Sequence, residues 1–183
     1  GHATVSWMLE YANPLVKVTI IPRGRALGAA WYLPEERQLT TVEQLMHEMA
    51  STLGGRASEE MIFGKISTGA LNDLERVTKQ AYAMVAYYGM SDGLRNMSYF
   101  DSSGSGEFSF GKPYSEKTAE QIDAEVKSLV GKTYVLAQEI LAQHREGLEQ
   151  LANLLLEREV IFSDDLEHIF GKRKTSSTSA ENE

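Results

Sequence analysis

The longest regular pattern in the sequence is an apolar stripe between about residues 115 and 143. Its apolar residues recur at spacings of three and four, which places them on one face of an α-helix. The stripe comprises Ile122, Val126, Leu129, Val130, Tyr134, Ala137, Ile140 and Leu141. Ser115 is the predicted cap of this helix, with Glu116 in its first turn. A helix with one sustained apolar face packs against other elements, so helix packing is expected to dominate the fold.

Shorter stretches with the same spacing predict further helices over about residues 3–12, 41–63, 71–88 and 145–157, and a last one from Ser163. Thr40 or Thr41 is the predicted cap of the second of these, with Glu43 or Gln44 in its first turn. Gly54-Gly55 interrupts the apolar pattern of that helix, which permits close packing, a kink or a break.

Two strands are predicted near the N-terminus. Val16, Val18 and Ile20 alternate with polar residues before Pro22, and residues 29–33 form a second apolar run before Pro34. The two are expected to form a small hairpin or sheet edge. Residues 97–100 and 108–110 are weaker strand candidates on either side of a Ser/Gly-rich stretch.

The predicted fold class is therefore mainly α. We expect a single helical domain over residues 1–171, with a small β-sheet or hairpin near the N-terminus and a C-terminal helical hairpin. The remaining residues, 172–183, are polar and rich in Ser and Thr, and are predicted to be a disordered tail.

Composition excludes several classes of function. The chain of 183 residues has no cysteine, so a metal site would need His, Asp or Glu ligands. A formal net charge of -8 disfavours binding to the phosphate backbone of nucleic acids. No apolar run approaches the roughly 18 residues that span a bilayer, so no direct membrane contact is expected from this chain.

Among the four histidines, His47 is the one in a motif-like context. His47-Glu48 begins like H-E-x-x-H, but Ser51 stands where the second histidine would be, so a polar helix face is the favoured interpretation. His144 and His168 lie on charged helical segments and are interpreted as surface residues.

The local sequence leaves the roles of His2 and Asp73 open. His2 opens an apolar helix directly after Gly1, and it is either a metal ligand or part of a Gly-His left by removal of an affinity tag. Asp73 lies near a predicted helix start, where aspartate usually caps the helix or complements its dipole.

Taken together, the stretches of this sequence resemble the peptidase domain of FtsH-type AAA proteases over about residues 1–171. The resemblance rests on an ordered set of motifs at compatible spacing: VKVTIIPRGRALG at 16–28, LP at 33–34, GGRASEE at 54–60, IFG at 62–64, STGA at 67–70, NDL at 72–74 and YGMS at 88–91. Each motif is weak alone, and the ordered set is specific.

The resemblance implies a zinc site. The family carries H-E-A-G-H on its zinc helix, and Gly1-His2 matches the last two positions. His2 and Asp73 would then be zinc ligands, and Glu59 would orient a ligand imidazole. The first histidine and the general-base glutamate would precede Gly1, so no catalytic residue is expected within the chain itself.

The same resemblance implies how substrate would bind and what the parent protein contains. The edge-strand residues Ala26, Leu27, Gly28, Ala29 and Ala30 would pair with an extended substrate. The parent would add an ATP-binding AAA module and transmembrane helices, form a homo-hexamer, and degrade unfolded and membrane proteins. It would lie in the bacterial inner membrane with this domain facing the cytoplasm, or in an organellar inner membrane.

As an N-terminally truncated domain, the chain is expected to bind zinc poorly and to be inactive by itself. Two alternatives remain. One is a non-catalytic helical module that holds a ring complex together, and the other is a free-standing helical adaptor unrelated to proteases.

Overall fold

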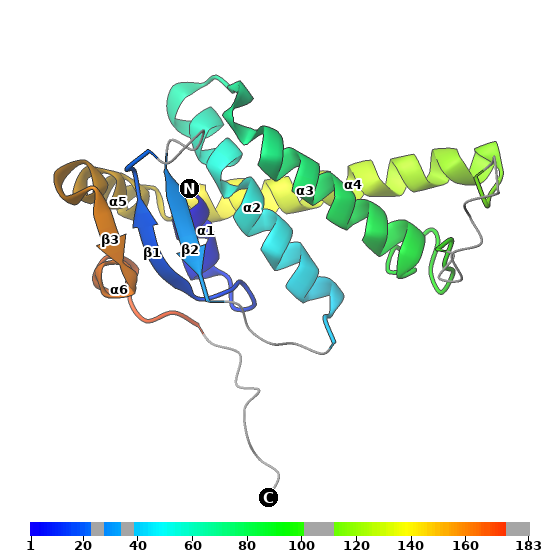
Figure 1. Ribbon diagram of the computed structural model, residues 1–183, viewed down its shortest axis with the longest axis horizontal. Coiled ribbons are helices and arrows are strands. Elements are labelled where there is room, and N and C mark those ends of the chain that lie inside the picture. The colour runs from blue at the N-terminus through cyan, green and yellow to red at the C-terminus, as the bar shows by residue number, and fades with distance from the viewer. Residues whose placement is uncertain (23–27, 34–38, 101–111, 175–183) are drawn as a thin grey trace, which may run out of the picture. The chain divides into compact units, whose positions relative to one another are not determined.

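The computed structural model describes residues 1–22, 28–33, 39–100 and 112–174 (Figure 1). The chain divides into two compact units, one made of Gly1–Ala70 with Thr133–Glu183 and the other of Leu71–Lys132. The long helix α4 (Glu116–Gln143) contributes residues to both. Helices dominate the described residues, so the predicted mainly α class is confirmed.

The first unit contains a three-stranded antiparallel sheet in the order β2-β1-β3. Strand β1 (Leu15–Thr19) pairs with β2 (Ala29–Tyr32), which confirms the predicted hairpin. The third strand, β3 (Val160–Phe162), was not predicted, because three residues between two helices are too few to show alternation. Val18 lies opposite Ala30 on one side and Ile161 on the other, and this row packs into the core.

Helix α1 (His2–Met8) lies between two apolar clusters of the first unit. Val5 belongs to a cluster with α2 (Val42–Phe63) and the C-terminal part of α4, and Trp7 to a cluster with the sheet, α5 (Arg145–Arg158) and α6 (Ser163–Phe170). The helix is shorter than the predicted 3–12, because Leu9 already has an extended backbone.

Helix α2 begins with the predicted capping box and continues unbroken to Phe63. The Thr41 side chain accepts from Gln44 N at 3.3 Å, and the Gln44 side chain accepts from Thr41 N at 2.8 Å. Gly54 and Gly55 lie within the helix, so the helix does not break at the glycine pair. Each costs roughly 0.5–1 kcal/mol relative to alanine in a helix interior, so their presence implies a packing role.

A polar contact joins α2 to α4 within the first unit. Tyr134 donates a hydrogen bond to Glu60 Oε2 at 2.5 Å, and Gln138 donates to the same oxygen at 3.2 Å. Partial burial, followed by the bond to Glu60, raises the pKa of Tyr134 to about 12. The phenol therefore stays a donor throughout the neutral range.

In the second unit, α3 (Leu71–Tyr82) continues as a π-helix, η2 (Ala83–Tyr87). The predicted helix over 71–88 is thus present, but its last turn widens. Val85 and Ala86 pack with Ile122 of α4, and the Tyr82 and Tyr114 hydroxyls lie 2.9 Å apart. Residues 97–100 form no strand, and residues 108–110 lie outside the described part of the chain.

The described C-terminal residues return to α1. Trp7 Nε1 donates to Gly171 O at 3.0 Å, and the Arg173 guanidinium donates to Ala12 O just beyond α1. Arg173 is the described residue of the predicted tail, 172–183, for which this contact is found, and residues 175–183 lie outside the described part. Across the residues that are described, no helix has both the length and the apolar character needed to cross a membrane.

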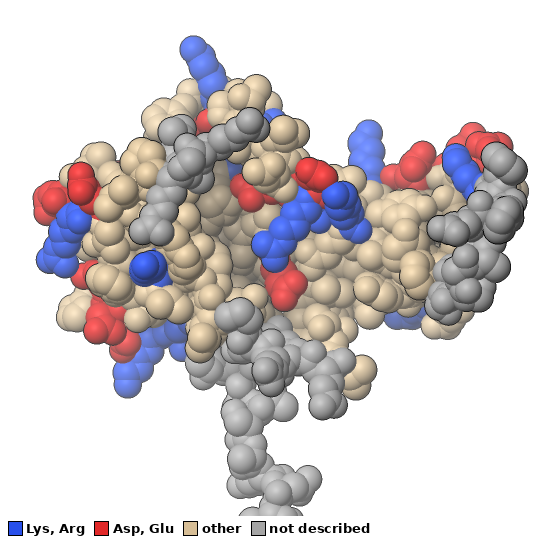
Figure 2. All heavy atoms as spheres, viewed as in Figure 1, with Lys and Arg blue, Asp and Glu red and all other residues tan. Residues whose placement is uncertain are grey.

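Charged side chains are mixed on the visible surface. Figure 2 shows lysine and arginine interspersed with aspartate and glutamate on this face, with no single basic patch among the described residues shown there.

Gly131 tests whether a helical glycine without a packing role destabilises this fold. A Cβ built at Gly131 in α4 meets nothing within 4 Å. Gly131→Ala should therefore raise the free energy of unfolding by roughly 0.5–1 kcal/mol, because alanine loses less backbone entropy. Urea denaturation of both proteins measures this, and a lowered stability would contradict it.

Candidate metal centre

His2, the first residue of α1, is fixed against α2 by a hydrogen bond. Its Nδ1 lies 3.0 Å from the carbonyl oxygen of Ser51. A carbonyl oxygen only accepts, so Nδ1 must carry the proton, and the neutral ring then has its lone pair on Nε2. Metal-ligating histidines usually donate their second N–H to such a partner. The ring chemistry of His2 therefore fits a zinc ligand that binds through Nε2.

The Gly54-Gly55 pair brings α1 close to α2. A Cβ at Gly55 would lie 2.4 Å from His2 Nε2, and a Cβ at Gly54 would lie 2.9 Å from Gly1 O. The sequence permitted close packing, a kink or a break at the glycine pair, and close packing is observed. No local pattern in the sequence connects Ser51 or Gly55 with His2, and the signal for Gly55 is the interruption of an otherwise apolar helix face.

Asp73 lies in the first turn of α3, in the second unit, and is partly buried. Its place there suits an acidic residue near a helix N-terminus. His2 belongs to the first unit. Within the described ranges, no three or more His, Asp or Glu side chains gather in a group that could hold a metal ion. The ligand roles remain predictions.

Glu59 and Arg56 organise the segment that follows α2. Glu59 Oε2 accepts from Ser67 N at 3.2 Å, and Arg56 Nη1 donates to Ser67 O at 2.8 Å. Hydrogen bonds from the Ser67 side chain and backbone lower the pKa of Glu59, with a smaller effect of Arg56. The predicted contact of Glu59 with a ligand imidazole stays a prediction.

Residues of α2 spaced by four form one row that includes His47, Ser51, Gly55 and Glu59. A spacing of four places them on one helix face. Ser51 contacts His2 of α1, and Gly55 lies under the His2 ring. His47 contacts Tyr11, in the segment that follows α1. His47, which begins the incomplete H-E-x-x-H pattern, thus lies on the α2 face that contacts His2.

His47 itself holds the chain where it leaves α1. Its Nδ1 accepts a hydrogen bond from Tyr11 N at 3.3 Å, and the two ring centroids lie 5.3 Å apart. Burial lowers the pKa of His47, against a smaller opposing effect of the Glu10 and Glu43 carboxylates. The neutral ring is therefore favoured, as the acceptor role of Nδ1 requires.

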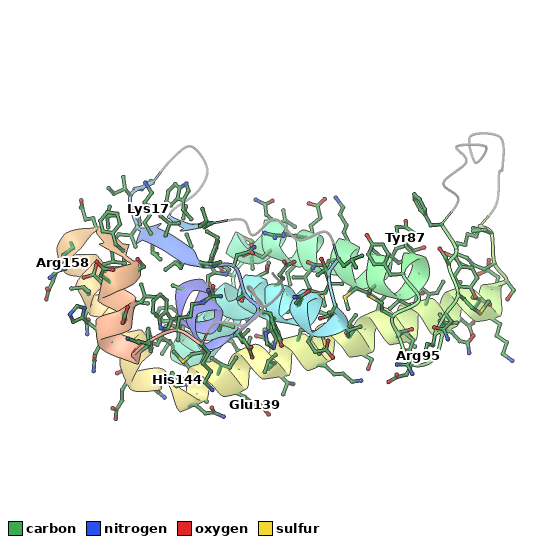
Figure 3. All side chains as sticks on the ribbon, turned by 90° about the horizontal axis from the view of Figure 1, so that it is seen from below. Lys17, Tyr87, Arg95, Glu139, His144 and Arg158 are labelled. Carbon is green, nitrogen blue, oxygen red and sulfur yellow. The ribbon has the colours of Figure 1, made fainter. Side chains whose placement is uncertain are left out.

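The two other histidines make local contacts. His144 precedes the first residue of α5, where Figure 3 labels it, and its ring packs edge-on against Phe170 with centroids 6.3 Å apart. His168 Nδ1 lies 2.7 Å from Asp164 O on the exposed side of α6.

The predicted substrate-binding strand lies at an edge of the sheet. Ala26 and Leu27 fall outside the described residues, whereas Ala29 and Ala30 belong to β2, and Gly28 directly precedes it. Strand β2 is a terminal strand in the order β2-β1-β3, with β1 on one side only among the described strands. Edge strands present backbone groups to which another strand can add. Substrate pairing there stays a prediction.

Comparison with known proteins identifies relatives along nearly the whole chain. The family model described as peptidase family M41 matches residues 1–169. An ATP-dependent zinc metalloprotease FtsH of Parabacteroides distasonis is 65% identical over 181 residues, which are 99% of this chain and 26% of that protein. The resemblance to FtsH-type proteases is thereby confirmed.

Mitochondrial relatives match over the same region. ATP-dependent zinc metalloprotease FTSH 10 of Arabidopsis thaliana is 50% identical over 97% of this chain and 21% of its own length. The mitochondrial inner membrane m-AAA protease component AFG3L1 of Mus musculus is 49% identical over 94% of this chain and 22% of its own. The chain thus spans about a quarter of the length of its relatives.

The contact between His47 and Tyr11 predicts a pH-dependent stability. The folded pKa of His47 is lowered from 6.5, so the folded state binds fewer protons than the unfolded state between the two pKa values. The contribution of His47 is therefore complete above about pH 7 and is lost as pH falls below about 6.5 through the lowered folded pKa.

His47→Asn is the matched variant for this prediction. The asparagine Oδ1 takes the place of Nδ1 and can accept from Tyr11 N at every pH. Urea denaturation between pH 5.5 and 8 should show a smaller fall of stability at low pH in the variant. Equal pH dependence in both proteins would contradict the assignment.

Proposed function

Because the chain belongs to peptidase family M41, a family of zinc metalloproteases, we propose that it is the zinc-binding peptidase domain of a membrane-anchored, ATP-dependent protease. The observation that carries this proposal is the hydrogen bond from His2 Nδ1 to Ser51 O. It holds the ring of the one histidine that aligns with the zinc motif in the tautomer that binds metal through Nε2.

In the proposed site, His2 supplies a neutral nitrogen donor and Asp73 a carboxylate oxygen. Together with a first histidine located before Gly1, they would give a three-ligand zinc site with one open position. Zinc bound there would lower the pKa of a water molecule to about 7 and prepare it for attack on a peptide carbonyl. The general-base glutamate that takes the proton would also precede Gly1.

The substrate in this proposal is an extended polypeptide. The edge of β2 offers backbone N–H and C=O groups, which bind a strand with little dependence on its sequence. Tolerance of this kind suits the degradation of unfolded and membrane proteins. Only extended segments reach such an edge, because folded proteins have already paired their backbone groups.

We propose further that the parent adds an ATP-hydrolysing AAA module and a membrane anchor and forms a homo-hexamer. Support comes from the relatives, which include ATP-dependent zinc metalloproteases and an inner membrane m-AAA protease component. The 65% identity with a bacterial relative favours a bacterial inner membrane, with this domain on the cytoplasmic side. An organellar inner membrane is the alternative.

The decisive experiment compares the 183-residue chain with a version extended by the parental residues before Gly1. We expect the extended protein to bind one zinc ion and to cleave casein. The shorter chain should do neither, because it supplies only two of the proposed ligands. Zinc content is measured by mass spectrometry of the metal, and cleavage by the release of labelled peptides.

Substitutions in the extended protein test the two ligands. His2→Ala and Asp73→Ala should each weaken zinc binding more than about a hundredfold, since even partners behind the ligands contribute about 10–100-fold. His144→Ala is the matched control and should leave the zinc affinity unchanged, because the His144 ring packs against Phe170 and is not a proposed ligand.

Two results would overturn parts of this proposal. An extended protein that folds but binds no zinc would support a non-catalytic assembly module. Stoichiometric zinc with robust proteolysis in the 183-residue chain would refute the proposed need for preceding residues.

A further inference from the structure

The α2 residues that face α1 hold the His2 ring through a contact that the proposed reaction does not itself explain. Ser51 and Gly55 are separated by one helical turn, and both contact the His2 ring. We call these two residues the imidazole seat. The His2 Nδ1 atom lies 3.0 Å from the Ser51 carbonyl oxygen, and the ring lies over the Cα of Gly55.

The two members of the seat depend on each other. In an α-helix, the carbonyl of one residue accepts from the N–H four residues on, so the Ser51 carbonyl points toward Gly55. A carbonyl oxygen has two lone pairs, and the second can accept from another donor only if that donor can approach. A side chain at position 55 would lie beside this approach, and glycine leaves it open.

The geometry shows how little space there is. A Cβ at Gly55 would lie 2.4 Å from Nε2, 2.8 Å from Cε1 and 3.1 Å from Cδ2 of His2. The first two distances are shorter than carbon contacts tolerate, so even a methyl group would move the ring. A displaced ring would lose its hydrogen bond to Ser51 and, with it, the preference for the Nδ1–H tautomer.

We propose that Gly55 is a positioning residue for zinc: it keeps the Ser51 carbonyl accessible, so that His2 is held in one tautomer with Nε2 presented for the metal before any metal binds. This inference rests on the proposed ligand role of His2. Gly55 acts only through His2, and its effect should appear in the metal-free protein.

The first test measures the tautomer of His2 without metal. Long-range nitrogen–proton NMR spectra of the ¹⁵N-labelled 183-residue chain distinguish a protonated ring nitrogen from an unprotonated one, and His2→Ala identifies the signals. In the unsubstituted chain, His2 should show a protonated Nδ1, together with a proton–proton contact between its ring and the Gly55 Hα atoms. A protonated Nε2 would overturn the proposal, whatever any variant does.

The second test compares Gly55→Ala with Gly131→Ala. Both place a methyl group on a helical glycine, but the Cβ at position 131 meets nothing within 4 Å. Gly55→Ala should shift His2 to a mixture of tautomers and weaken zinc binding in the N-terminally extended protein by about 10–100-fold. Gly131→Ala should leave both readouts unchanged, which separates a positioning effect from a general effect of alanine.

The outcomes distinguish this inference from the proposed function. If His2→Ala leaves zinc affinity unchanged, the proposed ligand role fails. If His2→Ala abolishes binding but Gly55→Ala keeps the original tautomer and affinity, only the role of Gly55 fails. Thermal unfolding of each variant is recorded alongside. Should Gly55→Ala not fold, the unsubstituted chain carries the test: a protonated Nε2, or no contact between the His2 ring and the Gly55 Hα atoms, overturns the proposal.

Discussion

The close contact between α1 and α2 is the interaction on which the first unit depends. The backbone of Gly1 packs directly against Gly54, and the ring of His2 packs against Gly55. A side chain at either glycine would prevent this close contact. With α1 held there, Val5 packs into one apolar cluster and Trp7 into the other. A shift of α1 away from α2 would therefore disturb both clusters and the orientation of His2 together.

Helix α1 relies on these neighbours for its helicity. In this 183-residue chain it has seven residues, fewer than the roughly 12–15 below which even a favourable isolated helix is marginal in water. The free energy that stabilises α1 must come from tertiary contacts. These are with α2 on one side, with the sheet and α6 on the other, and between the His47 ring and the segment that follows α1. The cost of two glycines inside α2 is a local loss that this packing offsets.

Local patterns of the sequence were sufficient for most elements. The spacing of apolar residues located the helices, and Thr41 with Gln44 marked the start of α2, because capping depends on residues three apart. Alternation located β1, and an apolar run before Pro34 located β2. Strand β3 was missed because its pairing with β1 depends on residues about 140 positions away, which no local pattern records.

The candidate site was only partly accessible to the same reasoning. His2 and Asp73 were identified through a family resemblance, since neither stands out locally from caps and chain ends. The partner of His2 was beyond prediction for a physical reason: it is a backbone carbonyl, and a carbonyl occurs at every position. Gly55, which keeps the Ser51 carbonyl accessible in our proposal, is visible in the sequence only as a gap in the apolar pattern of α2.

The contacts of Trp7 with Gly171 and of Arg173 with Ala12 have a consequence for the order of assembly during synthesis. They join residues more than 160 positions apart, so α1 leaves the ribosome long before the segment that secures it. Contacts of such separation form late and slow folding. Within these 183 residues, the helix that carries His2 is made first, and its contacts with Gly171 and Arg173 are among the last to form. A nascent chain therefore cannot present His2 in its final surroundings until almost all of its residues have emerged.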